Sequence, residues 1–144
     1  MKTRTIYAPY AWAIFHGLKH YETVPHRCHI RGTVAIHAAK TLPAHASVEF
    51  FRSLLQETND LTQINKYSPE WMKSLPRGVV LGTVDIIDCV PVETIRTNMP
   101  HLERAFGNYS DGRYALVLAD AKPFDTPIPA KGQQGWWNWE NKPD

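Results

Sequence analysis

The chain has 144 residues, 43% hydrophobic and 21% charged, which suits one globular domain, residues 1–144, with a hydrophobic core. No apolar run approaches the ~20 residues of a membrane-spanning helix, and the N-terminus lacks the apolar stretch of a signal peptide, so we expect a cytosolic protein that does not enter a membrane. The net charge of +2 hides an asymmetry, because residues 1–40 have a net charge of +5 and the other 104 residues have −3. A basic region attracts phosphates and other anions, although a solvated basic surface has the same composition.

In chain order, the first expected elements lie in this basic region. Residues 4–7 predict a short strand, and residues 10–16 predict a buried helix that begins after Pro9 and ends at Gly17. Residues 21–24 are expected to be extended. The segment therefore alternates short elements with turns, and the basic side chains follow those turns.

The middle of the chain predicts longer elements. Residues 32–37 alternate and contain β-branched side chains, which predicts a strand, whereas residues 44–57 show helical spacing. Residues 59–73 are expected to be irregular, with one helical turn, and to lie over the core. Residues 78–90 give the longest strand signal, and Gly82 within them predicts a bend or a bulge.

The last third completes a β-rich pattern. Residues 91–96 and 101–106 predict short helical pieces, and residues 113–119 predict another strand. Residues 124–135 are expected to be a loop, followed by a closing strand at residues 136–139. Together these elements predict an α+β fold, in which about six strands form a small, closed or nearly closed β-barrel surrounded by short helices.

The segment Gly17-x-Lys19-x-x-Glu22 offers reactive groups at a helix end. A lysine held near Arg27 and Arg31 loses part of its preference for the charged form, and a lysine with a lowered pKa can act as a base or nucleophile. Glu22 would pair with it or accept a substrate amine. The alternative is a lysine that caps the helix and makes an exposed ion pair.

Two arginines stand next to glycines where strands are expected to begin. Arg31 precedes Gly32, and a guanidinium beside a flexible backbone suits a phosphate. Arg113 follows Gly112 and would extend the basic rim. The alternative for both is a solvated arginine after a turn.

The sequence does not favour a metal or a cofactor. His26, Cys28 and His29 lie close together, but this spacing is a poor zinc pattern without a carboxylate or a CxxC pair. Cys28 and Cys89 are far apart in sequence, so reduced thiols are expected.

The segment Trp136-Trp137-Asn138-Trp139 places two indoles on one face of an extended chain. Exposed indoles would make a stacking platform for bases, whereas buried ones would close one end of the barrel. Burial is the favoured interpretation, with one tryptophan lining a cleft as the alternative.

These motifs, in this order, resemble the activating signal cointegrator homology (ASCH) domain, a family of the PUA-like superfamily. The resemblance covers nearly the whole chain. Its opening segments are Pro9 and Trp12, the G-x-K-x-x-E segment at Gly17, Lys19 and Glu22, and Arg31-Gly32 before a strand. Its later segments are Gly78, Gly82 and Val84, then FGNYSDGRYA from Phe106 and PIPAKGQQGWW from Pro127.

The resemblance implies a PUA-like β-barrel with a cleft that receives RNA or a nucleotide-like ligand. Lys19, Arg27 and Arg31 would face phosphates, Glu22 would contact a base or sugar, and a nearby aromatic ring would stack on the base. The predicted ligand-binding residues are Trp12, Lys19, Glu22, Arg27, Arg31, Arg113 and Trp139. Neither a cofactor nor a membrane partner is implied.

The resemblance also raises two hydrolytic activities, with Lys19 and Glu22 as the candidate catalytic residues. One small bacterial branch hydrolyses N4-acetylcytidine with a lysine, a threonine three residues later and a distant glutamate. Here Glu22 takes the threonine's place, Thr23 follows it, and Glu103 is the candidate distant glutamate. A carboxylate does not replace a hydroxyl nucleophile, so Glu22 departs from the pattern that this chemistry requires.

Another branch is linked to cleavage of single-stranded RNA, for which Lys19, His26 or His29, and Arg31 would supply a base and a cationic site. The sequence therefore leaves three functions open: an RNA- or nucleotide-binding module, a metal-free hydrolase, and a protein-interaction domain with an acidic partner. It also leaves open whether the protein is a monomer or a weak dimer.

Overall fold

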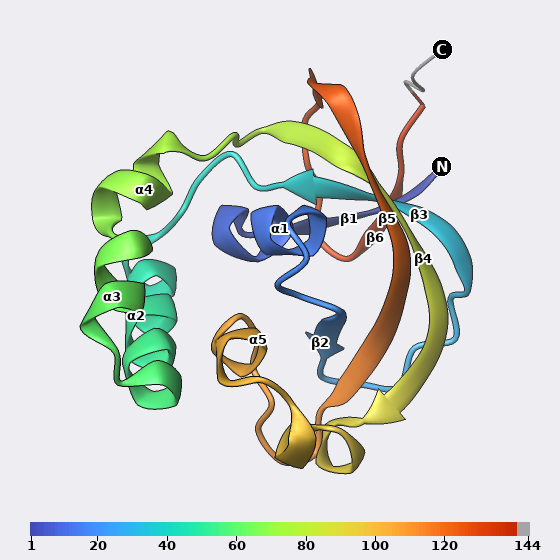
Figure 1. Ribbon diagram of the computed structural model, residues 1–144. Helices are drawn as coiled ribbons and strands as arrows, with labels where there is room; N and C mark the ends of the chain where they lie inside the picture. Colours follow the sequence, from blue (N-terminus) through green and yellow to red (C-terminus); the bar gives the residue numbers. More distant parts are fainter. Residues whose placement is uncertain (141–144) are drawn as a thin grey trace.

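Six strands form one curled sheet, a half-barrel, in the computed structural model, which describes residues 1–140 (Figure 1). The order across the sheet is β2-β5-β4-β3-β1-β6. The strands are β1 (Lys2–Ile6), β2 (Tyr21–Val24), β3 (Gly32–Ala38), β4 (Val79–Pro91), β5 (Tyr114–Pro129) and β6 (Trp136–Asn138). β1 and β3 are parallel, and the other neighbours are antiparallel. The predicted α+β, PUA-like fold of about six strands is confirmed.

The helices gather beside the half-barrel. They are α1 (Ala8–Phe15), α2 (Ala44–Thr58), α3 (Leu61–Lys66), α4 (Pro69–Ser74) and α5 (His101–Ala105), with 3-10 turns η1 (Val92–Thr94) and η2 (Arg96–Asn98). Figure 1 shows α1 between the sheet and the group formed by α2, α3 and α4. Within residues 1–140, no helix has the length and apolar character that crossing a bilayer requires.

Two apolar cores hold these layers together. One fills the concave side of the sheet, with Ile36, Ile86 and Leu116 almost fully buried. The other joins α1 to the helical group, where Phe50 and Phe106 pack with ring centroids 5.1 Å apart. Because α1 contributes residues to both cores, it has a fixed place between the sheet and the outer helices.

Gly82 lies at the predicted irregularity of the longest strand pair. The register between β4 and β5 shifts between Val80 and Gly82. A Cβ atom on Gly82 would lie 2.7 Å from the Pro123 Cα, closer than side chains approach a backbone. Glycine is therefore needed there because β5 passes directly over the position.

Two predictions of irregular structure are wrong. Residues 59–73 form α3 and α4, because Asp60 and Ser68 cap them by accepting hydrogen bonds from the amides of Thr62 and Trp71. These caps allow two helices in a stretch where apolar periodicity is weak.

The predicted loop at residues 124–135 is wrong in its first half, because β5 continues to Pro129 and pairs with the start of β4. The pairing of β2 with β5 ends at Val117, followed by one bond from the Leu118 amide to the His20 carbonyl, and beyond it no strand within residues 1–140 pairs with that edge of β5. Prolines on a free edge remove no ladder hydrogen bond. The closing strand is present as β6, which pairs with β1.

Candidate functional site

Lys19 reaches the interior because of the turn that ends α1. Gly17 has a φ of 74°, a left-handed conformation that glycine adopts without strain. The turn lets the amides of Leu18 and Lys19 both donate to the Ala13 carbonyl, at 3.1 and 3.2 Å. The chain then enters β2, and the Lys19 side chain, 1% exposed, points between the sheet and α5.

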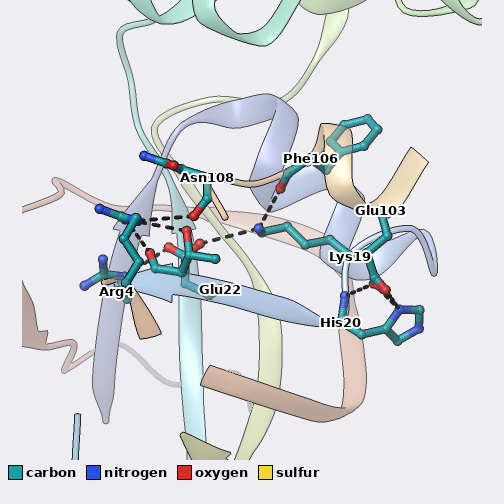
Figure 2. A network of polar contacts seen from close by, with 9 residues as sticks. Arg4, Lys19, His20, Glu22, Glu103, Phe106 and Asn108 are labelled. Atoms are coloured by element: carbon teal, nitrogen blue, oxygen red, sulfur yellow. Dashed lines mark hydrogen bonds and ion pairs between the residues drawn. The ribbon is translucent and has the colours of Figure 1, made fainter. Parts of the chain in front are cut away.

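The Lys19 ammonium lies between two oxygen acceptors. Nζ donates to the Phe106 carbonyl at 2.6 Å and lies 3.6 Å from Glu22 Oε1 (Figure 2). It also lies 5.7 Å from the centroid of the Tyr10 ring. A fully buried ammonium needs such partners because burial removes its water.

Glu22 joins Lys19 to a second cation on a different strand. Glu22 lies on β2 opposite Leu116, and its Oε2 accepts a 3.1 Å hydrogen bond from Arg4 Nε on β1. Arg4 in turn lies 5.5 Å from the Trp136 ring centroid. We call Arg4, Lys19 and Glu22 the polar cluster; it has two cations and one carboxylate.

Burial changes the acid–base properties of this region. It lowers the pKa of Lys19, an effect that the carboxylates of Glu22 and Glu103 partly oppose. Burial, and then the carboxylates of Glu49 and Glu22, raises the pKa of Tyr10 to about 12. Lys19 therefore releases its proton more readily than a surface lysine, whereas the Tyr10 hydroxyl stays protonated at neutral pH.

Arg113 extends the polar cluster from the start of β5. Its Nη2 donates to the Thr23 carbonyl at 3.1 Å, and its Nε donates to the Asn108 carbonyl at 3.2 Å. Desolvation by burial lowers the pKa of its guanidinium. Because the backbone acceptors fix its position, Arg113 presents charge in the same region as Glu22.

Glu103 lies near Lys19 but is engaged elsewhere. Its carboxylate accepts the His20 amide at 3.1 Å and contacts His20 Nδ1 at 2.9 Å (Figure 2). Glu103 is buried, so this pair fixes α5 against the entrance to β2. Its effect on Lys19 is therefore electrostatic, through a nearby negative charge.

Two adjoining clefts open onto the polar cluster. The larger cleft has a volume of about 1370 Å³ and the smaller cleft about 840 Å³. Their shared wall consists of Tyr7, Tyr10, Glu22 and Arg113. Arg4 lines the larger cleft and Lys19 the smaller one, so the polar cluster stands where the two meet.

The structure places Arg27 and Arg31 away from both clefts, in the connection between β2 and β3. The Arg27 guanidinium lies 4.8 Å from the Tyr114 ring centroid. Arg31 Nη1 donates to the Cys28 carbonyl at 3.0 Å, and its Nη2 lies 3.9 Å from Asp88. The sequence-predicted site is thus divided, with Lys19, Glu22 and Arg113 together.

Neither predicted tryptophan lines the clefts. Trp12 stacks on His16, with ring centroids 4.1 Å apart, and packs against the helical core. Trp139 is 3% exposed and packs beside Phe124. The aromatic side chains in the shared wall are instead Tyr7 and Tyr10.

Sequence reasoning missed Arg4 and Tyr10 as site residues. Arg4 and Ile6 are two residues apart and therefore share one face of β1, and Ile6 belongs to the core on the concave side of the sheet. The strand pattern thus indicates that Arg4 faces the same side. Tyr10 stands in the predicted helix, where it was interpreted as part of an apolar core. Pro9 predicts that the helix begins beside Tyr10, which places Tyr10 in the first turn of the helix.

A model of the ASCH domain matches residues 5–128. Activating signal cointegrator 1 of Homo sapiens and its counterpart in Mus musculus are each 25% identical to the chain over 142 residues, which is 96% of this chain. The chain spans only 22% of the length of these curated relatives, so the comparison concerns one part of each.

Proposed function

Because the chain belongs to the ASCH domain family, we propose that it binds RNA or a nucleotide-like ligand in the two clefts that meet at the polar cluster. The observation that supports this most is the buried Lys19–Glu22–Arg4 contact at the junction of the clefts. A carboxylate between two cations, where two open clefts meet, offers both an acceptor and positive charge to one ligand. Nucleotides need both.

Three groups in the shared wall each suit one part of a nucleotide. The guanidinium of Arg113 attracts phosphate, and its planar geometry allows two parallel hydrogen bonds. The Glu22 carboxylate accepts hydrogen bonds from base amino groups or ribose hydroxyls. The Tyr10 ring offers an apolar face on which a base stacks, at about 1–3 kcal/mol per base for such contacts.

A matched pair of arginine variants tests this proposal. Arg4→Gln removes a cation that lines the larger cleft, whereas Arg31→Gln removes one outside both clefts at the same cost in net charge. Fluorescence anisotropy with labelled single-stranded RNA should show weaker binding for Arg4→Gln and nearly unchanged binding for Arg31→Gln. Equal losses in the two variants would mean that binding is non-specific or lies elsewhere.

Saturation of the protein by RNA separates RNA binding from a protein-interaction function. If the clefts bind an acidic protein partner instead, single-stranded RNA will not saturate the protein at physiological salt. Arg4→Gln will then leave the weak attraction between RNA and protein unchanged. Saturable binding of RNA that depends on Arg4 supports the proposal.

One observation favours a second candidate, a hydrolase acting on RNA. Lys19 is fully buried and its pKa is lowered, which makes its neutral form available as a base. In that reaction Lys19 accepts the proton of a 2′-hydroxyl, whose oxygen attacks the adjacent phosphorus. The 5′-oxygen then leaves and takes the proton back from the Lys19 ammonium, which gives a 2′,3′-cyclic phosphate and a 5′-hydroxyl, while the guanidinium of Arg113 stabilises the developing negative charge.

Product analysis tests the second candidate. The protein and a Lys19→Met variant are incubated with single-stranded RNA and, separately, with N4-acetylcytidine, with and without chelator. Shortened RNA that requires Lys19 supports the hydrolase. Intact RNA with the unmodified protein leaves the binding function, and release of cytidine would show that Glu22 does not prevent amide hydrolysis.

A further inference from the structure

The larger cleft has a second group of cations far in sequence from the polar cluster. Lys40 follows β3, Arg77 precedes β4, and Lys131 follows β5. All three side chains are exposed and line the larger cleft. We call Lys40, Arg77 and Lys131 the cation rim.

Backbone hydrogen bonds bring the three segments of the cation rim together. The Gly78 amide donates to the Ala38 carbonyl at 2.8 Å, and the Ala130 amide donates to the Gly78 carbonyl at 3.1 Å. Each cation therefore stands within two residues of a bond that joins its segment to the next. The sheet therefore fixes the positions of the three backbones, from which the three charged side chains extend.

Buried side chains hold the Lys131 segment in place. His37, 1% exposed, contacts the Ala130 carbonyl through Nε2 at 2.7 Å. A carbonyl only accepts, so Nε2 bears the proton and Nδ1 accepts from the Thr5 hydroxyl, 3.1 Å away. A Cβ on Gly132 would lie 2.7 Å from His37 Cε1, so glycine lets the chain pass over the ring.

The charges lining the larger cleft are strongly one-sided. Its lining includes five cations, Arg4, Lys40, Arg77, Arg113 and Lys131, and a single carboxylate, Glu22. No ion pair found among residues 1–140 involves a member of the cation rim. The smaller cleft differs, with five cations and four carboxylates in its lining. The larger cleft is thus the one suited to a polyanion.

The size of the larger cleft points the same way. Pockets for single small molecules have volumes of about 300–1,000 Å³, and the larger cleft has about 1370 Å³. A strand with more than one nucleotide fits this volume and its open form. Gln133 and Gln134, beyond Lys131, add amide donors and acceptors along the same wall.

We propose that the cation rim binds the phosphates of a single-stranded RNA segment next to the nucleotide held at the polar cluster, so that the larger cleft is the path of the strand. This proposal rests on the proposed function, because it assigns a path to the same ligand. In this proposal Lys131 contacts a phosphate, and Gly132 lets the backbone that holds Lys131 pass over the His37 ring.

Neutralising the cation rim tests the proposal. The triple variant Lys40→Gln, Arg77→Gln, Lys131→Gln is compared with a control that loses the same charge at exposed lysines outside both clefts, Lys66→Gln, Lys73→Gln, Lys122→Gln. Both are titrated against labelled hexauridylate and against uridine monophosphate over a range of salt. Thermal unfolding confirms that each variant is folded.

We expect the rim variant to lose on the order of tenfold to a hundredfold in affinity for hexauridylate, and its log–log salt slope to fall by about 2, because each phosphate contact on a single strand contributes about 0.7. The control variant should keep the slope of the unmodified protein. Binding of uridine monophosphate should change little in either variant.

The other outcomes separate the two proposals. If the unmodified protein binds hexauridylate but the rim variant keeps its affinity and slope, the strand path is wrong and the proposed function stands. If hexauridylate binds no better than uridine monophosphate, the ligand is a nucleotide and the strand path is again overturned. If neither probe binds the unmodified protein, the proposed function fails, and this inference fails with it.

Discussion

Replacing Glu22 with glutamine should destabilise the protein through Lys19. The variant keeps the shape of the side chain and removes the charge that lies 3.6 Å from Lys19 Nζ. Lys19 is 1% exposed, so water does not replace the lost partner. Removing one partner of a buried pair costs about 3–5 kcal/mol. We expect the lower value, about 3 kcal/mol, because the Phe106 carbonyl still accepts from Nζ.

The loss should depend on pH in a direction that the Lys19 pKa determines. Burial lowers this pKa in the folded protein, and Glu22 partly restores it, so Glu22→Gln lowers it further. Between the lowered folded pKa and the unfolded value of 10.5, the unfolded chain binds more protons. The free energy of unfolding of the variant should therefore rise toward that of the unmodified protein as pH increases.

Urea denaturation at about pH 7 and about pH 9 measures both effects. With a slope of about 1.5 kcal/mol per molar urea, a loss of 3 kcal/mol moves the midpoint down by about 2 M. Glu70→Gln, an exposed glutamate on α4, is the control for the loss of one charge. Adding Lys19→Met to Glu22→Gln should recover part of the loss. The reasoning is refuted if Glu22→Gln is as stable as Glu70→Gln, or if its deficit grows at higher pH.

Three further outcomes test other contacts. Gly82→Ala should lower the thermal midpoint by about 6–12 °C, since overpacking against β5 costs about 3 kcal/mol. The nearest atoms belong to the backbone of Lys122 and Pro123, which cannot move aside as a side chain can. An unchanged midpoint would contradict the register of β4 against β5. Gly132→Ala should lower the free energy of unfolding by about 1–3 kcal/mol, because His37 has to move. Urea denaturation measures this loss, and an unchanged free energy of unfolding would contradict the contact. Burial lowers the pKa of His37, so unfolding free energy should fall as pH decreases below about 6.5; His37→Gln should flatten that slope, and an equally steep slope would exclude His37 as its source.

β3 was predictable from its β-branched residues and not from alternating burial, because its last five residues are all buried. Residues 32–37 were expected to be a strand and match β3, Gly32–Ala38. The helix expected at residues 44–57 matches α2, Ala44–Thr58. In the helix the apolar residues recur at helical spacing, which tertiary contacts reinforce rather than override.

The predictions that were wrong concern segments that lack such a pattern. In residues 59–73 the helices are only six residues long, and their stability comes from side-chain caps and from Tyr67 and Met72 in the helical core. In β5 the prolines suggested a loop, but they lie along a free edge. The caps of α3 and α4 are local, but the burial of Tyr67 and Met72 and the pairing of β5 with β4 depend on parts of the chain distant in sequence.

The candidate site was predictable where one segment contains it. Lys19 and Glu22 are three residues apart and lie in contact, as a helix end followed by a strand allows. Arg27 and Arg31 are nearly as close in sequence, but β2 extends by about 3.3 Å per residue away from the polar cluster. Arg4 is eighteen residues from Glu22 and contacts it at 3.1 Å, because β1 and β2 face the same concave space.

The most direct test of RNA binding in the clefts is to map the ligand on the protein by NMR. Isotope-labelled protein is titrated with hexauridylate, and the amide shifts are followed residue by residue. We predict that the largest changes fall on Tyr10, Glu22 and Gly132, with little change at Arg27 and Arg31. Changes concentrated at Arg27 and Arg31, or an absence of saturable change at Glu22, would contradict the assignment of the clefts as the binding site.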